Sequence, residues 1–284
     1  MLSPVSAPRV AICILNYNGW QDTLECLKSL KKLDYPDFQT IVIDNRSTGD
    51  DAMRINSWLT NNWPSAVFIQ SADNRGYAAG NNQGLRWALE RDFKYTWILN
   101  NDTVVNPDSL THLVTKAQSE PTTGLVGAMQ YYYDQPDKIL ARGGGYINKW
   151  LAISRHCIKP TDRLDYIPGA CLFMSAAMLR QIGLLDEDFF IYWEDSDISF
   201  RARKAGWALT LAEKARILHK ESATMGSQSE FSDYHHAKSG KLFFNKHHPR
   251  AVPVLMLTKM LQRIRKGRFG MMPLILRAFR EATH

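Results

Sequence analysis

Three carboxylates lie close together in the stretch FFIYWEDSDISFR at residues 189–201. They are Glu194, Asp195 and Asp197, and they follow an apolar and aromatic run. A positioned carboxylate can accept the proton of an attacking hydroxyl, which contributes about 10²–10⁴-fold to a rate. Asp197 and Arg201 are four residues apart, so on a helix we expect them to form an ion pair that makes Asp197 structural. Taken alone, the acidic run is better explained as the solvated start of a helix than as catalytic groups.

The aromatic residues before these acids have two explanations, because a ring can pack in a core or stack on a ligand. We expect core packing for Phe189 and Phe190. The sequence supports core packing and ligand contact equally for Trp193. Glu194 is placed to orient either a ligand or Asp195.

Polar segments also follow four strand-like runs. They read NYNGW, DNRSTGDD, SADNRGYAAGNNQG and NNDTVVNP. Asp44 comes directly after the second run, and Asp102 follows the fourth after two Asn residues. A single Asp in such a place is usually a turn or helix-cap residue. Four polar loops at one edge of an open α/β sheet predict a ligand site, because ligands bind beyond the carboxyl ends of the strands.

Three glycines in the third of these segments, Gly76, Gly80 and Gly84, are spaced four residues apart. This is not the GxGxxG fingerprint of dinucleotide-binding proteins, which is also absent after the first strand. On a helix, Gly80 and Gly84 share a face that permits close approach. Tight helix packing and a ligand explain that face equally well. The neighbouring Asn74, Asn81 and Asn82 favour a polar ligand.

The elements that must position these residues alternate between strand and helix. Short apolar runs predict strands at 10–15, 39–43, 67–70 and 95–99, and helical spacing predicts helices at 22–33, at 78–91 and from Pro107 onward. This alternation predicts an α/β fold with a mainly parallel sheet flanked by helices. After Gly124 the pattern becomes mixed, with further helices near 175–182 and 195–206.

Composition excludes several classes of function. The 284 residues carry a net charge of +7, yet the first 240 hold 25 basic and 27 acidic side chains. The excess sits in the tail, so we expect no nucleic-acid partner. Zinc signatures, a Walker loop and the GxSxG elbow of hydrolases are absent. The four cysteines lack CxxC spacing, so we expect them to be reduced packing residues in a cytoplasmic protein. The sequence predicts neither a signal peptide nor a membrane span.

The C-terminal tail interleaves apolar and basic residues. From Lys241 onward there are ten Lys or Arg residues and one acid, Glu281. Residues 251–282 predict two short amphipathic helices that suit an anionic membrane surface, here the cytoplasmic face of an inner membrane. Packing against the preceding domain, or in a homodimer, is the alternative. We therefore divide the chain into a domain at 1–240 and a basic helical tail at 241–284.

Seven motifs together resemble family 2 glycosyltransferases of the GT-A fold, in particular their bacterial rhamnosyltransferase-like branch. They are LNYNG at 15–19, VIDNRSTGD at 42–50, DNRGYAAGNNQG at 73–84, LNND at 99–102, YIPGACLFM at 166–174, GLLDEDFFIYWEDSDISFRARKAGW at 183–207 and LHKESATMG at 218–226. They occur in the family's order and cover roughly residues 9–226. Each motif alone is weak, whereas seven in order identify the family.

The resemblance implies a nucleotide-diphosphate-sugar donor, a glycan or lipid-linked glycan acceptor, a divalent cation (Mn²⁺ or Mg²⁺) and inversion at the anomeric carbon. It implies Asp195 as the catalytic base and Asp102 with His219 as metal ligands. The residues implied to contact the nucleotide are Tyr17, Asp44, Asn74, Gly76, Asn81 and Asn101. Those implied at the acceptor are Gly169, Trp193 and Glu194.

One motif departs from the family pattern. The family's Asp-x-Asp is Asn100-Asn101-Asp102 here, so one carboxylate is missing and the metal is expected to depend more on the donor's phosphates. Two alternatives stay open. A noncatalytic glycan- or membrane-binding protein would tolerate the weakened motif. A sugar nucleotidyltransferase would need a basic phosphate loop near the first strand, which NYNGW does not provide.

Overall fold

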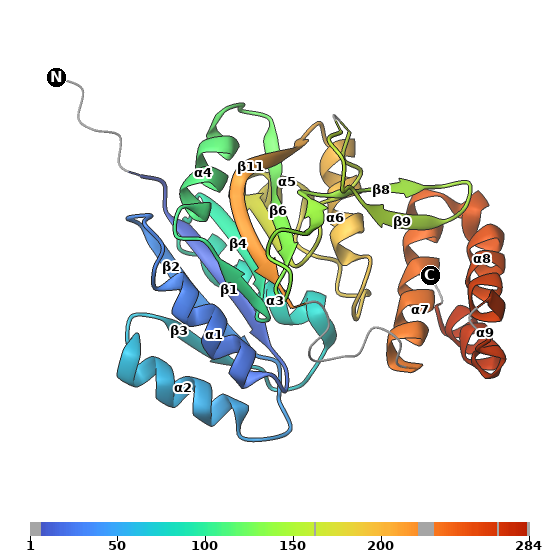
Figure 1. Ribbon diagram of the computed structural model, residues 1–284, viewed down its shortest axis with the longest axis horizontal. Helices are drawn as coiled ribbons and strands as arrows, with labels where there is room; N and C mark the ends of the chain where they lie inside the picture. Colours follow the sequence, from blue (N-terminus) through green and yellow to red (C-terminus); the bar gives the residue numbers. More distant parts are fainter. Residues whose placement is uncertain (1–6, 162, 221–229, 266, 283–284) are drawn as a thin grey trace.

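A mixed β-sheet lies at the centre of the computed structural model, which describes residues 7–161, 163–220, 230–265 and 267–282 (Figure 1). Within these residues the sheet has nine strands in the order β3-β2-β1-β4-β10-β6-β11-β5, with β7 beside β6. The strands are β1 (Val10–Asn16), β2 (Phe38–Asp44), β3 (Val67–Gln70), β4 (Tyr95–Asn100), β5 (Thr103–Val105), β6 (Thr123–Tyr132), β7 (Ile139–Arg142), β10 (Cys171–Ser175) and β11 (Ala208–His219). The predicted α/β fold with helical appendage is confirmed.

The parallel half of the sheet brings the polar loops together. Strand β1 pairs in parallel with β2 and with β4, and the register places Asn16 beside Asp44 and Leu15 beside Asn100. Strand β10 then pairs antiparallel with both β4 and β6, which turns the remainder of the sheet into the mixed pattern expected after Gly124. The carboxyl ends of β1, β2 and β4 therefore meet at one edge, as the sequence predicted.

Helices cover both faces of the sheet. One face packs against α1 (Trp20–Leu30), α2 (Asp51–Asn62) and α4 (Ser109–Gln118), and the other against α3 (Gly76–Leu89), α5 (Ala176–Ile182) and α6 (Glu194–Lys204). Strand β1 supplies both cores by alternation, with Ile12 and Ile14 on the first face and Ala11 and Cys13 on the second. This alternation explains why its sequence is a continuous apolar run.

Helix α3 settles the question of the glycine face. A Cβ at Gly80 would lie 2.6 Å from Leu15 Cδ1, and one at Gly84 would lie 2.7 Å from Cys13 Sγ. The two glycines thus let α3 pack directly on β1, and tight helix packing is the correct explanation. All four cysteines are buried and free, as predicted. Helix α2 has a regular apolar face, with Ile55 and Leu59 buried, that the sequence patterns did not identify.

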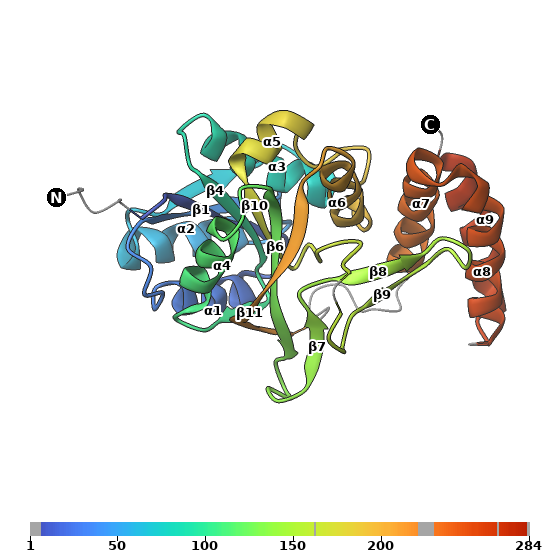
Figure 2. The ribbon, with the colours of Figure 1, turned by 90° about the horizontal axis from the view of Figure 1, so that it is seen from above.

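The C-terminal helices form a separate cluster beside the sheet, bridged to it by a hairpin (Figures 1 and 2). The hairpin comprises β8 (Gly145–Asn148) and β9 (Ile153–His156), and the cluster comprises α7 (Glu230–His247), η1 (Pro249–Ala251), α8 (Val252–Arg265), η2 (Phe269–Met271) and α9 (Met272–Glu281). Two helices in 251–282 were predicted and are confirmed. The proposed domain boundary at residue 240 falls within α7. In the described residues, no helix is long and apolar enough to cross a membrane.

Candidate active site

A first cavity of about 310 Å³ opens at the edge where β1, β2 and β4 end. It contains five of the residues implied at the nucleotide and the metal, namely Tyr17, Asn74, Asn101, Asp102 and His219. The other lining residues are Leu15, Asn45, Tyr77, Asn100, Phe190, Ile191, Tyr192 and Phe231. Segments separated by some two hundred residues thus build one wall, because β5, which directly follows β4, pairs antiparallel with the end of β11 and places His219 opposite Thr103.

A hydrogen-bond network shapes the floor of this cavity. Asn45 Nδ2 donates to Asn74 Oδ1 at 2.9 Å and to the Gly76 carbonyl at 3.1 Å. The Gly76 amide in turn donates to Asn74 Oδ1 at 2.9 Å. Asn45 Oδ1 is buried with no hydrogen-bond partner among the described residues. An unpaired buried acceptor is costly, so this oxygen is available to a ligand's hydroxyl or amine.

Gly76 is required by its surroundings. Its φ angle is +94°, which is the left-handed region that favours glycine, and a Cβ there would lie 2.2 Å from the Phe190 carbonyl oxygen. The next amide, Tyr77 N, donates to that same carbonyl at 2.6 Å. The start of α3 is therefore fastened to the segment that precedes the acidic run.

Asp44 and Asn81 lie behind the cavity rather than in it. Asp44 is fully buried and accepts from Asn16 Nδ2 at 2.9 Å and from the Ser47 amide at 3.1 Å. Asn81, also fully buried, donates back to the Tyr77 carbonyl at 3.0 Å. Neither side chain lines this cavity or the second cavity described below. Their direct contact with a nucleotide stays a prediction, and the geometry gives them a positioning role.

Asp102 and His219 form the pair implied as metal ligands. His219 Nε2 lies 3.2 Å from Asp102 Oδ1, and both side chains are largely buried. Asp102 Oδ1 and His219 Nδ1 lack a well-aligned hydrogen bond among the described residues. Adjacent ligands of an octahedral ion with bonds near 2.1 Å would lie about 3.0 Å apart, so the pair fits one divalent cation. No group of three or more His, Cys, Asp or Glu side chains in the described residues is arranged to hold a metal ion, so the remaining ligands would come from elsewhere.

Lys220 fixes the end of β11 and hence His219. Its Nζ atom lies 2.6 Å from both Asp22 Oδ1 and Glu25 Oε2 on α1. Burial lowers the pKa of Lys220, but the hydrogen bonds to the two acids outweigh it and raise the pKa overall. The Lys220 amide also donates to the Asp102 carbonyl at 3.1 Å. The Lys220 ammonium group is thus paired with two acids of α1. The rest of the motif LHKESATMG, residues 221–226, lies outside the described residues.

Asn100 and Asn101 point in different directions. Asn101 Nδ2 donates to Thr23 Oγ1 at 3.0 Å and so faces the start of α1. Asn100 Oδ1 accepts from the Tyr77 hydroxyl at 3.0 Å, and the same hydroxyl lies 2.9 Å from the Gly169 carbonyl. Burial raises the pKa of Tyr77 well above its usual range, so the hydroxyl stays neutral. Tyr77 therefore joins the first cavity to a second one.

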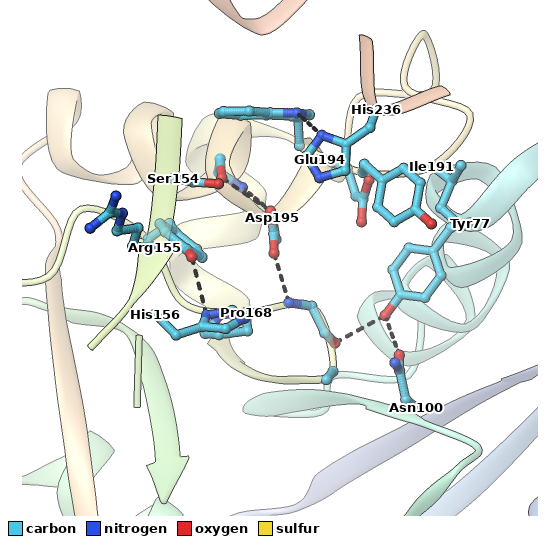
Figure 3. A pocket seen from close by; sticks show the side chains of 16 residues that line it. Tyr77, Asn100, Ser154, Arg155, His156, Pro168, Ile191, Glu194, Asp195 and His236 are labelled. Atoms are coloured by element: carbon cyan, nitrogen blue, oxygen red, sulfur yellow. Dashed lines mark hydrogen bonds between the residues drawn. The ribbon is translucent and has the colours of Figure 1, made fainter. Parts of the chain in front are cut away.

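The second cavity, of about 510 Å³, is lined by the first two acids of the run, Glu194 and Asp195 (Figure 3). Asp195, Glu194, Gly169 and Trp193, the residues implied at the reaction centre and acceptor, all line it. The further lining residues are Tyr77, Asn100, Ser154, Arg155, His156, Tyr166, Pro168, Ala170, Ile191, Tyr192, Ser196 and His236. Tyr77, Asn100, Ile191 and Tyr192 line both cavities, so the two share a wall.

Asp195 is held at the first turn of α6 with its carboxylate toward this cavity. Oδ2 accepts from the Gly169 amide at 3.0 Å, and Oδ1 accepts from the Ser196 amide at 2.6 Å. Burial raises the pKa of Asp195, and these hydrogen bonds to the ionised form oppose the rise. Ser199 Oγ donates to the Asp195 carbonyl at 2.7 Å and accepts from the Ile167 amide, which ties the Gly169 loop to the helix.

Glu194 is the more deeply buried of the two acids. It is 5% exposed, and its Oε2 atom has no hydrogen-bond partner among the described residues. Burial raises the pKa of Glu194 well above its usual range, and the neighbouring Asp195 raises it further. Two adjacent carboxyls with different burial tend to hold one proton between them. Burial thus favours the protonated form of Glu194, whereas the amide hydrogen bonds to Asp195 favour its ionised form.

The backbone is strained at the two residues that precede α6. Tyr192 and Trp193 have φ angles of +67° and +71°, which are unfavourable for residues with side chains and often occur at functional sites. Trp193 is only 4% exposed, its Nε1 donates to His236 Nδ1 at 3.1 Å, and its ring packs on Phe243. Core packing therefore accounts for most of Trp193. Phe189 is fully buried as predicted, whereas Phe190 lines the first cavity.

Asp197 has the structural role that the sequence predicted. Its Oδ2 atom lies 2.7 Å from Arg201 Nε, and Oδ1 lies 2.8 Å from His247 Nε2. Burial raises the pKa of Asp197, but the contacts with His247 and Arg201 outweigh it and lower the pKa overall. The side chain thus fastens α6 to α7 and does not line either cavity.

Among the site residues that sequence reasoning missed are Asn45, Tyr77 and His236. Asn45 follows Asp44 directly and could have been found from its place at the end of β2. Tyr77 follows Gly76, but nothing in its type distinguishes a bridging tyrosine from a packed one. His236 comes from α7, where burial lowers its pKa to about 3 and keeps it neutral. Only the docking of the C-terminal helices brings it to the second cavity.

The sequence profile described as "Glycosyl transferase family 2" matches residues 11–182. The chain belongs to glycosyl transferase family 2. The predicted resemblance is therefore confirmed, and the chain is a glycosyltransferase rather than a protein of another class. The match ends before the acidic run, so the assignment of roles at residues 194–197 depends on the geometry described above.

Two curated relatives give the same family context. The chain is 26% identical over 220 residues to "Low-salt glycan biosynthesis hexosyltransferase Agl10" of Haloferax volcanii, covering 75% of this chain and 67% of the relative. It is 26% identical over 211 residues to "N-acetylglucosaminyl-diphospho-decaprenol L-rhamnosyltransferase" of Mycobacterium tuberculosis, covering 66% of this chain and 69% of the relative.

Solved structures agree on the GT-A fold. A mannosyltransferase from Pyrobaculum calidifontis in complex with GDP-Man and Mn²⁺ has a TM-score of 0.65 at 18% identity, covering 99% of this chain and 77% of that one. GalNAc-T7 with UDP, GalNAc and Mn²⁺ has a TM-score of 0.67 at 15% identity, covering 93% and 55%. At these identities the likeness establishes the fold and not the substrate.

Proposed function

We propose that this glycosyltransferase moves a sugar, with inversion, from a nucleotide diphosphate onto a hydroxyl of a glycan or lipid-linked glycan precursor. One observation carries the proposal. The Asp102–His219 pair and the Asp195 carboxylate line two cavities that share a wall at Tyr77 and Asn100. An inverting transfer needs the leaving group and the base on opposite flanks of the anomeric carbon, and two joined cavities supply those flanks.

Asp195 is proposed as the base. Its carboxylate is fixed by the amides of Gly169 and Ser196, so its orientation is set before the acceptor arrives. The raised pKa strengthens it as a proton acceptor, while the amide hydrogen bonds favour the ionised form that accepts the proton. Glu194, protonated beside it, can donate a hydrogen bond to a second acceptor hydroxyl and thereby orient the sugar.

A divalent cation, Mn²⁺ or Mg²⁺, is proposed to bind at Asp102 and His219. Bound there, it would neutralise the charge that develops on the leaving diphosphate. Asn100 replaces the family's first carboxylate, so Asp102 is the one charged ligand of the pair. We therefore expect binding of the cation to depend strongly on the donor's phosphate oxygens. The two solved relatives with Mn²⁺ and a nucleotide or nucleotide sugar favour this assignment by analogy.

The base and ribose of the donor are proposed to lie in the first cavity against Tyr17, Asn45 and Asn74. Asp44 and Asn81 would act from behind, by holding the Ser47 loop and the first turn of α3. Rhamnose is the preferred donor sugar only by analogy with the mycobacterial relative, whose name specifies rhamnosyl transfer to a diphospho-decaprenol acceptor. A lipid-linked acceptor agrees with the basic tail, whose membrane contact stays a prediction, as does a homodimer.

The test is donor turnover with purified protein. UDP-, GDP- and dTDP-sugars are incubated with and without Mn²⁺, and release of the nucleoside diphosphate is measured. The proposal expects metal-dependent release from one donor class, accelerated by an acceptor. Release of pyrophosphate would indicate a nucleotidyltransferase, and glycan binding without any donor turnover would indicate a noncatalytic protein. Either result would overturn the proposal.

A further inference from the structure

The hairpin β8–β9 ends in two exposed apolar side chains. Trp150 is 78% exposed and Leu151 is 53% exposed, and both follow Lys149 at the turn. An exposed tryptophan is unusual in a soluble protein unless the residue contacts something. Figures 1 and 2 both show the tip of this hairpin beside α8, about one hundred residues later in the chain.

Helix α8 presents a second row of exposed apolar side chains. Leu257, Leu261 and Ile264 are 57%, 48% and 40% exposed, and their spacing places them on one face. The opposite side of the helix is already packed, since Leu255 is fully buried in the C-terminal core. Thr258 Oγ1 donates to the Leu151 carbonyl at 2.9 Å, so the hairpin tip and this helix are in contact. We call Trp150, Leu151, Leu257, Leu261 and Ile264 the apolar ridge.

Cations surround the apolar ridge without matching acids. The sequence contains no Asp or Glu from Lys138 to Thr161, nor from Tyr234 to Arg280. Lys149, Arg250 and Arg265 are exposed, and no ion pair involving them occurs in the described residues. A protein partner would usually bury few lysines at the centre of its interface, whereas a surface of mixed apolar and cationic side chains matches anionic lipid.

A basic cleft of about 800 Å³ adjoins the ridge at the hairpin. Its cationic lining residues are Lys149, Arg163, Arg203 and Lys204, and Trp150 lines it too. The buried Asp165 carboxylate holds two of them, since its Oδ1 atom lies 3.0 Å from Arg163 Nη2 and 2.8 Å from Arg203 Nη1. One carboxylate does not balance four cationic side chains, so the cleft is cationic overall. The contacts with Asp165 also hold the Arg163 and Arg203 side chains in place before any ligand binds.

We propose that the apolar ridge and the basic cleft together form a docking surface for an anionic membrane. Trp150 and the α8 row would enter the interfacial region, and the cleft would receive a phospholipid headgroup phosphate. The surface predicted from the sequence involved the tail alone, whereas this one depends on a hairpin of the catalytic domain. Its use in bringing a lipid-linked acceptor to Asp195 rests on the proposed function, but its binding to lipid does not.

The experiment measures partition of the full chain onto vesicles of phosphatidylcholine with and without phosphatidylglycerol. We expect binding to the anionic vesicles only, weakened by salt. Trp150→Ser with Leu151→Ser, and separately Leu257→Ser with Leu261→Ser, should each lower the partition coefficient at least about tenfold. Lys149→Gln with Lys204→Gln should lower it by about fivefold per cation. Met53→Ser on α2, which removes a side chain 66% exposed at the other end of the molecule, should change nothing.

Two outcomes would overturn the docking surface. One is unchanged vesicle binding in both serine pairs, with thermal unfolding confirming that the variants fold. The other is a change of oligomeric state on gel filtration in place of a change in lipid binding, which would make the ridge a contact between copies of the chain. Donor turnover with a water-soluble acceptor is measured in parallel and should be unaffected by the serine pairs. Failure of the proposed transfer is thereby distinguished from failure of the membrane contact.

Discussion

The carboxylate of Asp195 accepts a hydrogen bond from the backbone amide of Gly169 at 3.0 Å. The Gly169 carbonyl, on the other side of the same residue, lies 2.9 Å from the Tyr77 hydroxyl. One residue of the loop before β10 therefore contacts both the proposed base and a side chain that lines both cavities. The backbone of Gly169 thus links the proposed base to the Tyr77 side chain of the proposed donor cavity.

Asp195→Asn tests the base directly. The amide keeps the size of the side chain but cannot accept the acceptor's proton, so transfer should fall by about 10²–10⁴-fold. Donor affinity, measured by calorimetry with the nucleoside diphosphate and Mn²⁺, should stay within about twofold, because Asp195 does not line the first cavity. A matched loss of donor binding would remove Asp195 from the base role.

Asp188→Asn is the control for that substitution. Asp188 is an exposed acid in the same loop region, with its side chain 70% exposed and 3.6 Å from Lys246. Exposed ion pairs contribute little to stability, and Asp188 does not line the second cavity. Its replacement should leave both transfer and donor binding unchanged.

The sequence predicted the half of the site that belongs to the parallel strands. Asp102 and Asn74 follow short apolar runs, and parallel pairing must bring the ends of such runs to one edge. It did not predict that Asp44 would turn into the Ser47 loop, because an Asp after a strand can face either a ligand or its own turn. Asn45, one residue later, faces the cavity instead.

The contribution of the C-terminal helices was beyond sequence reasoning. The pattern at 251–282 predicted two helices, but the sequence predicted neither α7 nor the contacts of His236 with the second cavity and of His247 with Asp197. Such contacts depend on how helices α7–α9 dock, which no local pattern encodes. The exposure of Trp150 was equally unpredictable, since a tryptophan in a hairpin is more often buried.

The proposed metal site can be tested by removing one ligand and by adding one carboxylate. His219→Ala should weaken Mn²⁺-dependent donor binding by at least about tenfold, since a ligand to the ion is lost. Asn100→Asp restores the carboxylate that the family motif usually has, and should lower the Mn²⁺ concentration needed for half-maximal donor binding. Tyr77 can still donate to the new carboxylate, so the local hydrogen bond survives. An unchanged Mn²⁺ requirement in both variants would contradict a metal site at Asp102 and His219.

Glu194→Gln should make the protein more stable at neutral pH. The folded-state pKa of Glu194 is raised, so between the unfolded value and the folded value the native state binds more protons than the unfolded state. The free energy of unfolding then falls as pH rises through this range, by up to about 1.4 kcal/mol for each pH increment of one. Glutamine removes that loss. Urea unfolding of both proteins should give a positive difference at pH 7.5 that vanishes near pH 4, whereas a difference independent of pH would contradict a protonated Glu194.

Gly76→Ala tests the fastening of α3 to the acidic segment. The new Cβ would lie 2.2 Å from the Phe190 carbonyl oxygen at a φ of +94°, so both a backbone clash and left-handed strain oppose it. Gly206→Ala is the matched control, because its φ is +90° but nothing lies within 4 Å of the added Cβ. The control should lose about 1 kcal/mol in free energy of unfolding, from backbone strain alone. Gly76→Ala should lose about 3 kcal/mol or more and also weaken donor binding, since Asn74 and Phe190 must move to admit the methyl group. Equal losses in the two variants would mean that the contact with Phe190 does not constrain the cavity.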